Sequence, residues 1–207
     1  MRLSPFWTAA DFFRPAGVIL HGAGQLIFRE VEDHDLIAKA RRGDVEAYNL
    51  LVSRWERRVF NYLFRIVGDR EDALDLSQEA FLKAYQNLGK LEDPGRFAPW
   101  LFRIAHNEAF SLLRRRKPDR EPVEARGQPF LSARLLPLEL ALAVESALAL
   151  LSDDQREAVL LKIYQGFNFE EMAEILSCPV STVKSRVYAA LDILKDALAP
   201  INTRGVE

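Results

Sequence analysis

Apolar residues recur three and four positions apart over most of this chain, and that spacing restricts its fold more than any other feature. Such spacing places apolar side chains on one face of a helix, whereas a half-buried strand requires strict alternation. The sequence has no sustained alternation and no Asn-Gly or Asp-Gly hairpin turn. The predicted fold class is therefore all-α.

Capping residues divide the first half of the chain into helices. Asp44 and Asp69 each precede a long amphipathic segment, and Gly68 follows the first of these segments. Aspartate is a favoured helix N-cap, and glycine commonly ends helices because it adopts left-handed backbone angles. The loop "GKLEDPGRFAP" separates these helices from a further one that is expected to start near Pro99. With a short helix ahead of them, they predict a four-helix domain over residues 34–117.

A second helical domain is predicted after an extended linker. Residues 118–137 contain Pro, Gly and mixed charge without a helical period, as is typical of a linker. Helical spacing resumes over residues 138–199, and residues 200–207 form a tail. Residues 1–33 are assigned as an N-terminal extension of unknown role. Their apolar run "AGVIL" is too short for a signal core or a membrane span, so no membrane insertion is expected.

Composition excludes several classes of protein. The net charge of −2 over 207 residues is not that of a general nucleic-acid coat, so any contact with DNA must use local patches. Cys178 is the only cysteine and has no Cys or His neighbours at metal-ligand spacing, which excludes a zinc finger. It also favours a reducing, cytoplasmic location. No cofactor or metal site is predicted.

The segment "NFEEMAEILSCPVSTVKSRV" indicates a helix-turn-helix unit. Asn168 and Glu171 have the spacing of a capping box, and Pro179 prevents the first helix from continuing through the turn. On the second helix, an apolar face is expected at Val183, Val187, Leu191 and Leu194. Its early residues would reach base edges in a major groove while cations neutralise phosphates. An ordinary helical hairpin with a solvated face is the alternative.

Two other helices carry opposite charge. Residues 69–79 have five acidic residues and one Arg, whereas residues 100–117 have four Arg, one Lys and one Glu. Such segregation in a nearly neutral chain indicates two different partners, although a solvated helix face would also explain the acidic segment. The outward side of the acidic helix is expected to carry Asp72, Asp75, Gln78, Glu79, Leu82 and Lys83.

The basic helix combines aromatic and cationic residues beside a loop. Rings stack on unstacked bases, cations follow phosphates, and an amide such as that of Asn107 reads a base edge. Phe97, Trp100 and Ile104 are expected to be packing residues rather than contacts. The terminal Arg cluster would also complement the dipole at the C-terminal end of the helix.

Four ordered segments together resemble bacterial RNA polymerase sigma factors of the sigma-70 family, in the small extracytoplasmic-function branch. These are "LIAKARRGDVEAYNLLVSRW", "DREDALDLSQEAFLKAYQNL", "FAPWLFRIAHNEAFSLLRRR" and "LSDDQREAVLLKIYQGFNFEEMAEILSCPVSTVKSRV". The resemblance implies that residues 34–117 correspond to sigma region 2, which binds core polymerase and opens the minus-ten element. Residues 138–199 would correspond to region 4, which reads the minus-thirty-five element.

The resemblance assigns roles by position. Core polymerase would contact Asp75, Gln78, Glu79 and Leu82. The minus-ten element, including a flipped-out base of the melted non-template strand, would contact Leu91, Arg96, Arg103, Asn107, Arg114, Arg115 and Arg116. The minus-thirty-five element would contact Thr182, Lys184, Ser185, Arg186 and Tyr188. Because Ala189 and Ala190 replace cations that family members often carry there, base preference is not transferred. An anti-sigma protein is implied as a further partner.

Two other functions explain less of the sequence. A stand-alone helix-turn-helix regulator would account for residues 168–194 alone, and such proteins usually bind two half-sites as dimers. A carboxylate-bridged metal enzyme would use the acidic helix, but the chain lacks a Glu-x-x-His motif, and its three His stand apart at positions 21, 34 and 106. We therefore expect a non-catalytic initiation factor.

Overall fold

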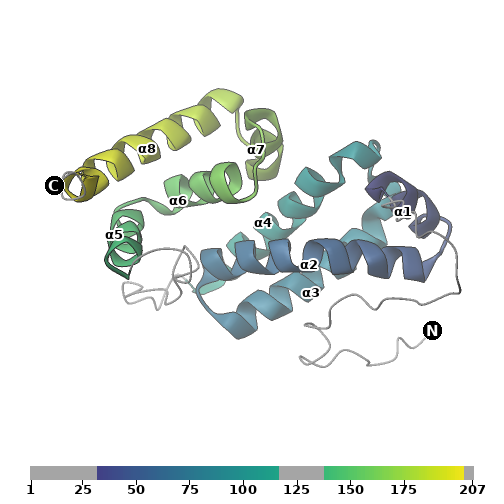
Figure 1. Ribbon diagram of the computed structural model, residues 1–207. Helices are drawn as coiled ribbons and strands as arrows, with labels where there is room; N and C mark the ends of the chain where they lie inside the picture. Colours follow the sequence, from purple (N-terminus) through teal and green to yellow (C-terminus); the bar gives the residue numbers. More distant parts are fainter. Residues whose placement is uncertain (1–31, 117–137, 203–207) are drawn as a thin grey trace, which may run out of the picture. The chain divides into compact units, whose positions relative to one another are not determined.

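The computed structural model describes residues 32–116 and 138–202, and every regular element in these ranges is helical (Figure 1). This confirms the all-α prediction; the predicted linker lies outside the described residues. In chain order, the helices are α1 (Asp33–Ala40), α2 (Val45–Val67), α3 (Arg70–Asn87), α4 (Phe97–Arg116), α5 (Leu138–Ala149), α6 (Asp153–Val159), α7 (Phe169–Leu176) and α8 (Val180–Asn202). None of the helices within those ranges combines the length and apolarity of a membrane span.

The predicted caps form as expected. The Asp44 carboxylate accepts a hydrogen bond from the Ala47 N–H at 3.0 Å, and that of Asp69 accepts from the Asp72 N–H at 2.9 Å. Gly68 ends α2 with φ of 79°. The helix expected near Pro99 begins two residues earlier, at Phe97, because a 3-10 turn over Pro94–Arg96 leads directly into it. Pro99 is tolerated there because the first-turn N–H groups of a helix have no acceptor within it.

The core of the N-terminal domain is aromatic. Trp55 of α2 meets Phe97 and Phe102 of α4 in edge-on contacts, with ring centroids 6.3 and 6.5 Å apart. Tyr62, about two turns further along α2, packs on the same Phe102 ring with the centroids 5.2 Å apart. Phe97 is 1% exposed, so its prediction as a packing residue is confirmed. These contacts fix α4 against α2.

Two helices of the C-terminal domain, α6 and α7, each begin with a capping box. Ser152 and Gln155 cap α6, which continues as a π-helix over Leu160–Tyr164, and Asn168 and Glu171 cap α7. Ser177 ends α7 with φ of 50° and begins the turn into α8. The helix-turn-helix prediction is confirmed in its local geometry.

One residue of the predicted apolar face of α8 does not lie in the core. Val183 and Val187 are buried as expected, but Ala190 completes the buried side and Leu191 is 39% exposed. The reason is geometric: position 190 lies seven residues, about two full turns, after Val183 and returns to the direction of the packed face, whereas position 191 is rotated one residue further around the helix. Leu191 instead borders an apolar groove described below.

The described residues from Asp33 onward form one compact unit, in which α4 packs against α7. The ring centroids of Phe102 and Phe167 lie 5.0 Å apart. Arg58 of α2 also donates to Gln165, through Nε to the side-chain oxygen at 3.1 Å and through Nη2 to the backbone oxygen at 2.7 Å. The two helical halves therefore share part of their core.

We predict that Gly68→Ala lowers the free energy of unfolding by about 1 kcal/mol, because an alanine at φ of 79° is strained by its Cβ. Gly89→Ala is the matched control, since a Cβ at Gly89 meets no atom within 4 Å and its φ is not positive. Urea denaturation measures both variants. Equal free energies for the two would contradict the assigned role of Gly68.

Candidate functional site

The acidic side of α3 is an open face of the N-terminal domain. Asp75, Gln78 and Leu82 are exposed and Glu79 is half-buried. The opposite side of α3 is buried in the core, and it carries Ala73, Ser77, Ala80 and Ala84. The structure therefore groups all four residues predicted to contact core polymerase on one face; the contact itself stays a prediction.

A groove of about 440 Å³ runs beside this acidic face, between α3 and α4. Lys83 bridges the two helices, with Nζ 2.7 Å from a Glu108 carboxylate oxygen and 3.3 Å from one of Glu79. These two carboxylates raise the pKa of Lys83, with the Glu108 hydrogen bond as the main cause. Lys83 thus holds Glu79 beside α4 and remains half-exposed itself.

The basic end of α4 is partly neutralised within the chain. Arg114, Arg115 and Arg116 are all exposed. Arg116 makes a two-pronged pair with Asp72 of α3, one prong of which is 2.7 Å, and this pair raises the pKa of Arg116. Exposed pairs of this kind are weak, so a DNA phosphate can compete for Arg116.

The loop between α3 and α4 contains two residues predicted to contact the minus-ten element, and their environments differ. The side chain of Leu91 is only 5% exposed and belongs to the core, so direct contact with a base is not its role in this structure. Arg96 is half-buried and pairs with Glu174 of α7, with Nε 3.1 Å from a carboxylate oxygen. That hydrogen bond raises the pKa of Arg96.

Asn107 and Arg103 lie on the exposed side of α4, one helical turn apart. No side-chain hydrogen bond of Asn107 occurs within the described part of the chain, and its amide points to solvent beside an otherwise packed helix. An exposed amide flanked by cations offers both a donor and an acceptor to a base edge. The base-reading role of Asn107 stays a prediction.

The second helix of the helix-turn-helix presents a polar and cationic side. Lys184, Ser185 and Tyr188 are exposed, while Thr182 and Arg186 are half-buried. Phe169 of α7 supports two of them: the Lys184 Nζ lies 5.5 Å from its ring centroid, and the Tyr188 ring lies 6.2 Å from it. Arg186 pairs with Asp154 of α6 at 2.6 Å. All five predicted minus-thirty-five residues therefore lie on the early part of one helix.

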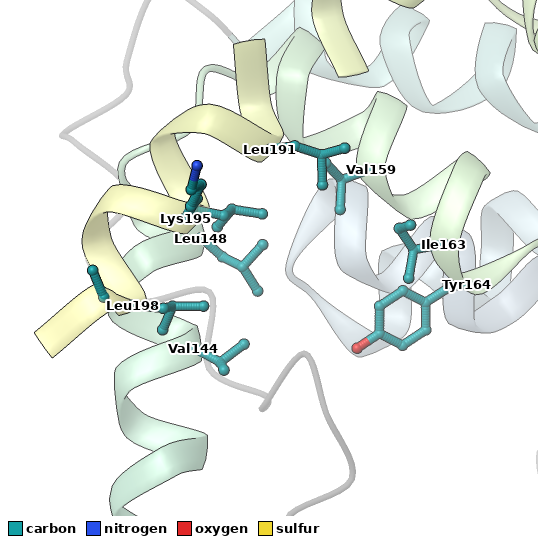
Figure 2. A pocket seen from close by; sticks show the side chains of 10 residues that line it. Val144, Leu148, Val159, Ile163, Tyr164, Leu191, Lys195 and Leu198 are labelled. Carbon is teal, nitrogen blue, oxygen red and sulfur yellow. The ribbon is translucent and has the colours of Figure 1, made fainter. Parts of the chain in front are cut away.

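An apolar groove of about 830 Å³ lies between α5, the α6 π-helix and α8. Figure 2 shows side chains from these elements converging on it, among them Val144, Leu148, Ile163 and Leu191, with Tyr164 at one side. Ile163 is 60% exposed and Leu191 is 39% exposed. Contiguous exposed apolar area of this kind is typical of an interaction surface rather than of a catalytic site.

No group of three or more His, Cys, Asp or Glu side chains in residues 32–116 and 138–202 is arranged to hold a metal ion. The three surfaces described above are the acidic side of α3, the loop and exposed side of α4, and the polar side of α8. Each of them presents charged or amide groups to solvent.

Comparison with known proteins gives these surfaces a common context. The family model of sigma-70 region 2 matches residues 51–118, and that of sigma-70 region 4 matches residues 141–194. The chain is 33% identical over 184 residues to the RNA polymerase sigma-H factor of Pseudomonas aeruginosa, covering 82% of this chain and 95% of that protein. The chain belongs to the sigma-70 family, in its extracytoplasmic-function branch.

Further relatives and solved structures agree with this assignment. The extracytoplasmic-function sigma-E factor of Escherichia coli K12 is 33% identical over 189 residues, covering 84% of this sigma factor and 98% of the relative. The fold is similar to that of CnrH in complex with the cytosolic domain of CnrY, with a TM-score of 0.61, 28% identity, and coverage of 81% and 97%. It is also similar to the sigma factor RpoE of Bartonella quintana, solved with the anti-sigma factor NepR, with a TM-score of 0.60, 28% identity, and coverage of 73% and 96%.

Sequence reasoning missed a buried polar cluster in this sigma factor. Glu157 of α6 is 1% exposed and accepts a hydrogen bond from the Tyr62 hydroxyl of α2. The His106 Nδ1 of α4 lies 2.7 Å from the same carboxylate oxygen. Burial, reinforced by Glu157, raises the pKa of Tyr62 well above its ordinary value. The available signal was a single acid that directly precedes the apolar run "AVLL" on a helix.

The Glu157 cluster joins region 2 to region 4 next to Asn107. Its members come from three helices, and two of them, Tyr62 and Glu157, are almost fully enclosed. A buried donor or acceptor that loses its partner costs far more than an exposed one, because water cannot replace the bond. The cluster therefore selects a particular alignment of α2, α4 and α6.

We predict that Glu157→Ala lowers the free energy of unfolding by about 2 kcal/mol, since it leaves the Tyr62 hydroxyl buried without an acceptor. Glu157→Gln keeps an acceptor oxygen and should cost about 1 kcal/mol or less. Urea denaturation compares these variants with Glu170→Ala, which removes an exposed acid of α7. If Glu157→Ala and Glu170→Ala are equally stable, the buried cluster does not form.

Proposed function

We propose that this sigma factor binds core RNA polymerase and directs promoter-specific initiation, reading minus-ten and minus-thirty-five elements and helping to melt the DNA. It acts as a non-catalytic subunit in the cytoplasm, where the polymerase works. The proposal rests chiefly on the grouping of Asp75, Gln78, Glu79 and Leu82 on one open face of the region 2 domain. A stand-alone DNA-binding regulator has no use for such a face.

The two DNA surfaces suit different forms of DNA. The polar side of α8 has the size and cations to lie in the major groove of a duplex, with Lys184 and Arg186 on phosphates. The exposed side of α4 offers the Asn107 amide with Arg103 and the terminal arginines, which suits single-stranded bases and their phosphates. We assign the first to the minus-thirty-five element and the second to the melted minus-ten element.

An anti-sigma protein is the proposed regulator. A solved relative of similar fold, RpoE of Bartonella quintana, is in complex with the anti-sigma factor NepR. The same open surfaces that would serve polymerase and DNA here are available to a competing protein. Occupation of the α3 face would block polymerase, and occupation of the α8 face would block DNA.

Charge reversal at Asp75 and Glu79, each to Lys, should weaken binding to core polymerase about ten-fold or more, because two favourable charges become repulsive. Lys83 keeps its bond to Glu108, so the fold should persist. Binding is measured by titrating labelled protein with core polymerase, and minus-thirty-five duplex binding should be unchanged.

The control for this pair is the double variant Asp35→Lys with Glu46→Lys, which changes the net charge equally at exposed positions on α1 and α2. It should bind core polymerase like the wild type. If both double variants lose the same affinity, total charge and not the α3 face governs binding.

Asn107→Ala should leave core binding within about two-fold of wild type and reduce promoter opening about ten-fold, because an unmade hydrogen bond to a base costs 1–3 kcal/mol. Permanganate reactivity of the minus-ten thymines reports opening. Asn61→Ala, an exposed asparagine of α2, provides the matched control. Full opening by the Asn107 variant would remove this residue from the DNA surface.

A transcription assay with sigma-free core polymerase and a pool of promoter fragments tests the whole proposal. New transcripts that start at particular fragments are the expected result, and their shared sequence gives the promoter motif. Absence of core binding by folded, monomeric protein would overturn the proposal and favour a stand-alone helix-turn-helix regulator.

A further inference from the structure

The backbone between α3 and α4, residues 88–96 (the 88–96 loop), contains two 3-10 turns with an extended stretch between them. Its two leucines face inward: Leu88 is 3% and Leu91 is 5% exposed. Within the second turn, Asp93 accepts from the Gly95 N–H at 2.8 Å. Glu92, Asp93 and Gly95 are exposed, so the loop presents a polar surface above two apolar anchors.

The guanidinium group of Arg41 bonds to the backbone of this loop. Arg41 Nε donates to the Leu88 carbonyl oxygen at 3.2 Å, and Nη2 donates to the Leu91 carbonyl oxygen. The two acceptors are three residues apart: Leu88 begins the first 3-10 turn and Leu91 directly follows it. A planar guanidinium holds two donors at a fixed mutual angle, so it fixes both carbonyls relative to each other. A lysine ammonium has no such fork.

The position of Arg41 is itself defined by the turn between α1 and α2. The Arg41 N–H donates to the Ile37 oxygen at 2.9 Å, and the Gly43 N–H donates to the Ala40 oxygen at 3.0 Å. Gly43 has φ of 91°, which a side chain would strain. Ile37 and Ala40 are buried in the core. The backbone of Arg41 is therefore held in place by this turn, and its guanidinium group reaches the loop.

The other end of the loop is held by aromatic packing. Phe97 directly follows it, and its ring lies 6.3 Å from Trp55 and 6.1 Å from Trp100. Trp55 in turn donates from Nε1 to Asp33 at the start of α1, at 2.9 Å. The first part of the loop is thus tied through Arg41 to the turn that follows α1, and its far end is tied through Trp55 to the start of α1.

We propose that Arg41 is a positioning residue that sets the shape of the 88–96 loop and thereby its preference among minus-ten bases. This inference rests on the proposed function, with the 88–96 loop added to the minus-ten surface because the sigma-factor resemblance places Leu91 and Arg96 there together with Asn107. A pocket discriminates between bases only if its backbone groups are held in place before the base arrives. Arg41 lies in the turn that follows α1 and is exposed. It holds the loop by its hydrogen bonds to the Leu88 and Leu91 carbonyl oxygens.

The test compares four full-length proteins: wild type, Arg41→Ala, Arg41→Lys and the control Arg42→Ala. Arg42 is the next residue of the same turn, is exposed, and its removal changes the net charge equally. Hydrogen exchange of the free proteins is measured first. Arg41→Ala and Arg41→Lys should speed exchange at loop amides about five-fold or more, with α2 unchanged, whereas Arg42→Ala should match wild type.

Promoter opening is then measured with core polymerase on a fragment selected by the wild type and on fragments with each minus-ten base replaced. Both Arg41 variants should reduce the ratio of opening between the selected and replaced fragments about five-fold, with core binding unchanged. Restored discrimination in Arg41→Lys would mean that Arg41 contacts a phosphate, and would overturn the positioning role. An unchanged ratio or unchanged exchange in Arg41→Ala would overturn it as well.

The two proposals fail in different ways. If wild-type protein neither binds core polymerase nor opens any fragment, the proposed function fails, while the exchange data still decide whether Arg41 holds the loop. If wild type opens promoters and Arg41→Ala discriminates as well as Arg42→Ala, only the positioning role fails.

Discussion

The arrangement of the N-terminal domain depends on the contacts that the Trp55 indole makes with α1 and α4. The indole lies edge-on to Phe97 and Phe102 of α4, receives the Arg58 guanidinium over its face at 4.5 Å, and donates to Asp33 of α1. Buried aromatic side chains contribute large apolar area together with directional contacts. Because α1, α2 and α4 meet at this one ring, the loop before α4 and the exposed side of α4 acquire fixed positions. The candidate minus-ten surface therefore depends on a residue that is itself buried.

Many of the cations that would contact DNA are paired inside the chain. Arg96 pairs with Glu174, Arg116 with Asp72, and Arg186 with Asp154. Exposed ion pairs contribute only about 0.2–1 kcal/mol each, so they keep the side chains extended without preventing exchange for a phosphate. Buried Glu157 is different, because its partners Tyr62 and His106 cannot be replaced by water at similar cost. The weak ion pairs thus lie on the surfaces where DNA would have to compete for the arginines. The stronger Glu157 cluster lies where α2, α4 and α6 meet.

Local signals were predictable from sequence, and long-range contacts were not. Asp44 and Asp69 were identified as caps because a cap involves residues only three apart, and the Asn168 box was identified for the same reason. The outward face of α3 followed from helical spacing. The sigma-factor resemblance placed Leu91 on the DNA surface by its position, and its loop has no period from which burial could be inferred. Its 5% exposure results from packing within the folded domain, which no local pattern encodes.

The sequence by itself determined the all-α class, most helix ends, the helix-turn-helix and the separation of acidic from basic helices. Each of these depends on neighbours within about one helical turn or on the types of residue present. Only the tertiary structure decided that Leu191 borders a groove, that Glu157 joins Tyr62 and His106, and that Arg41 holds two carbonyls of the 88–96 loop. The hydrogen bonds among these contacts link residues 47 to 95 positions apart, and the Tyr62–Glu157 bond has the separation of 95. Their partners are chosen by how whole helices pack, and that choice has no signature in a short stretch of sequence.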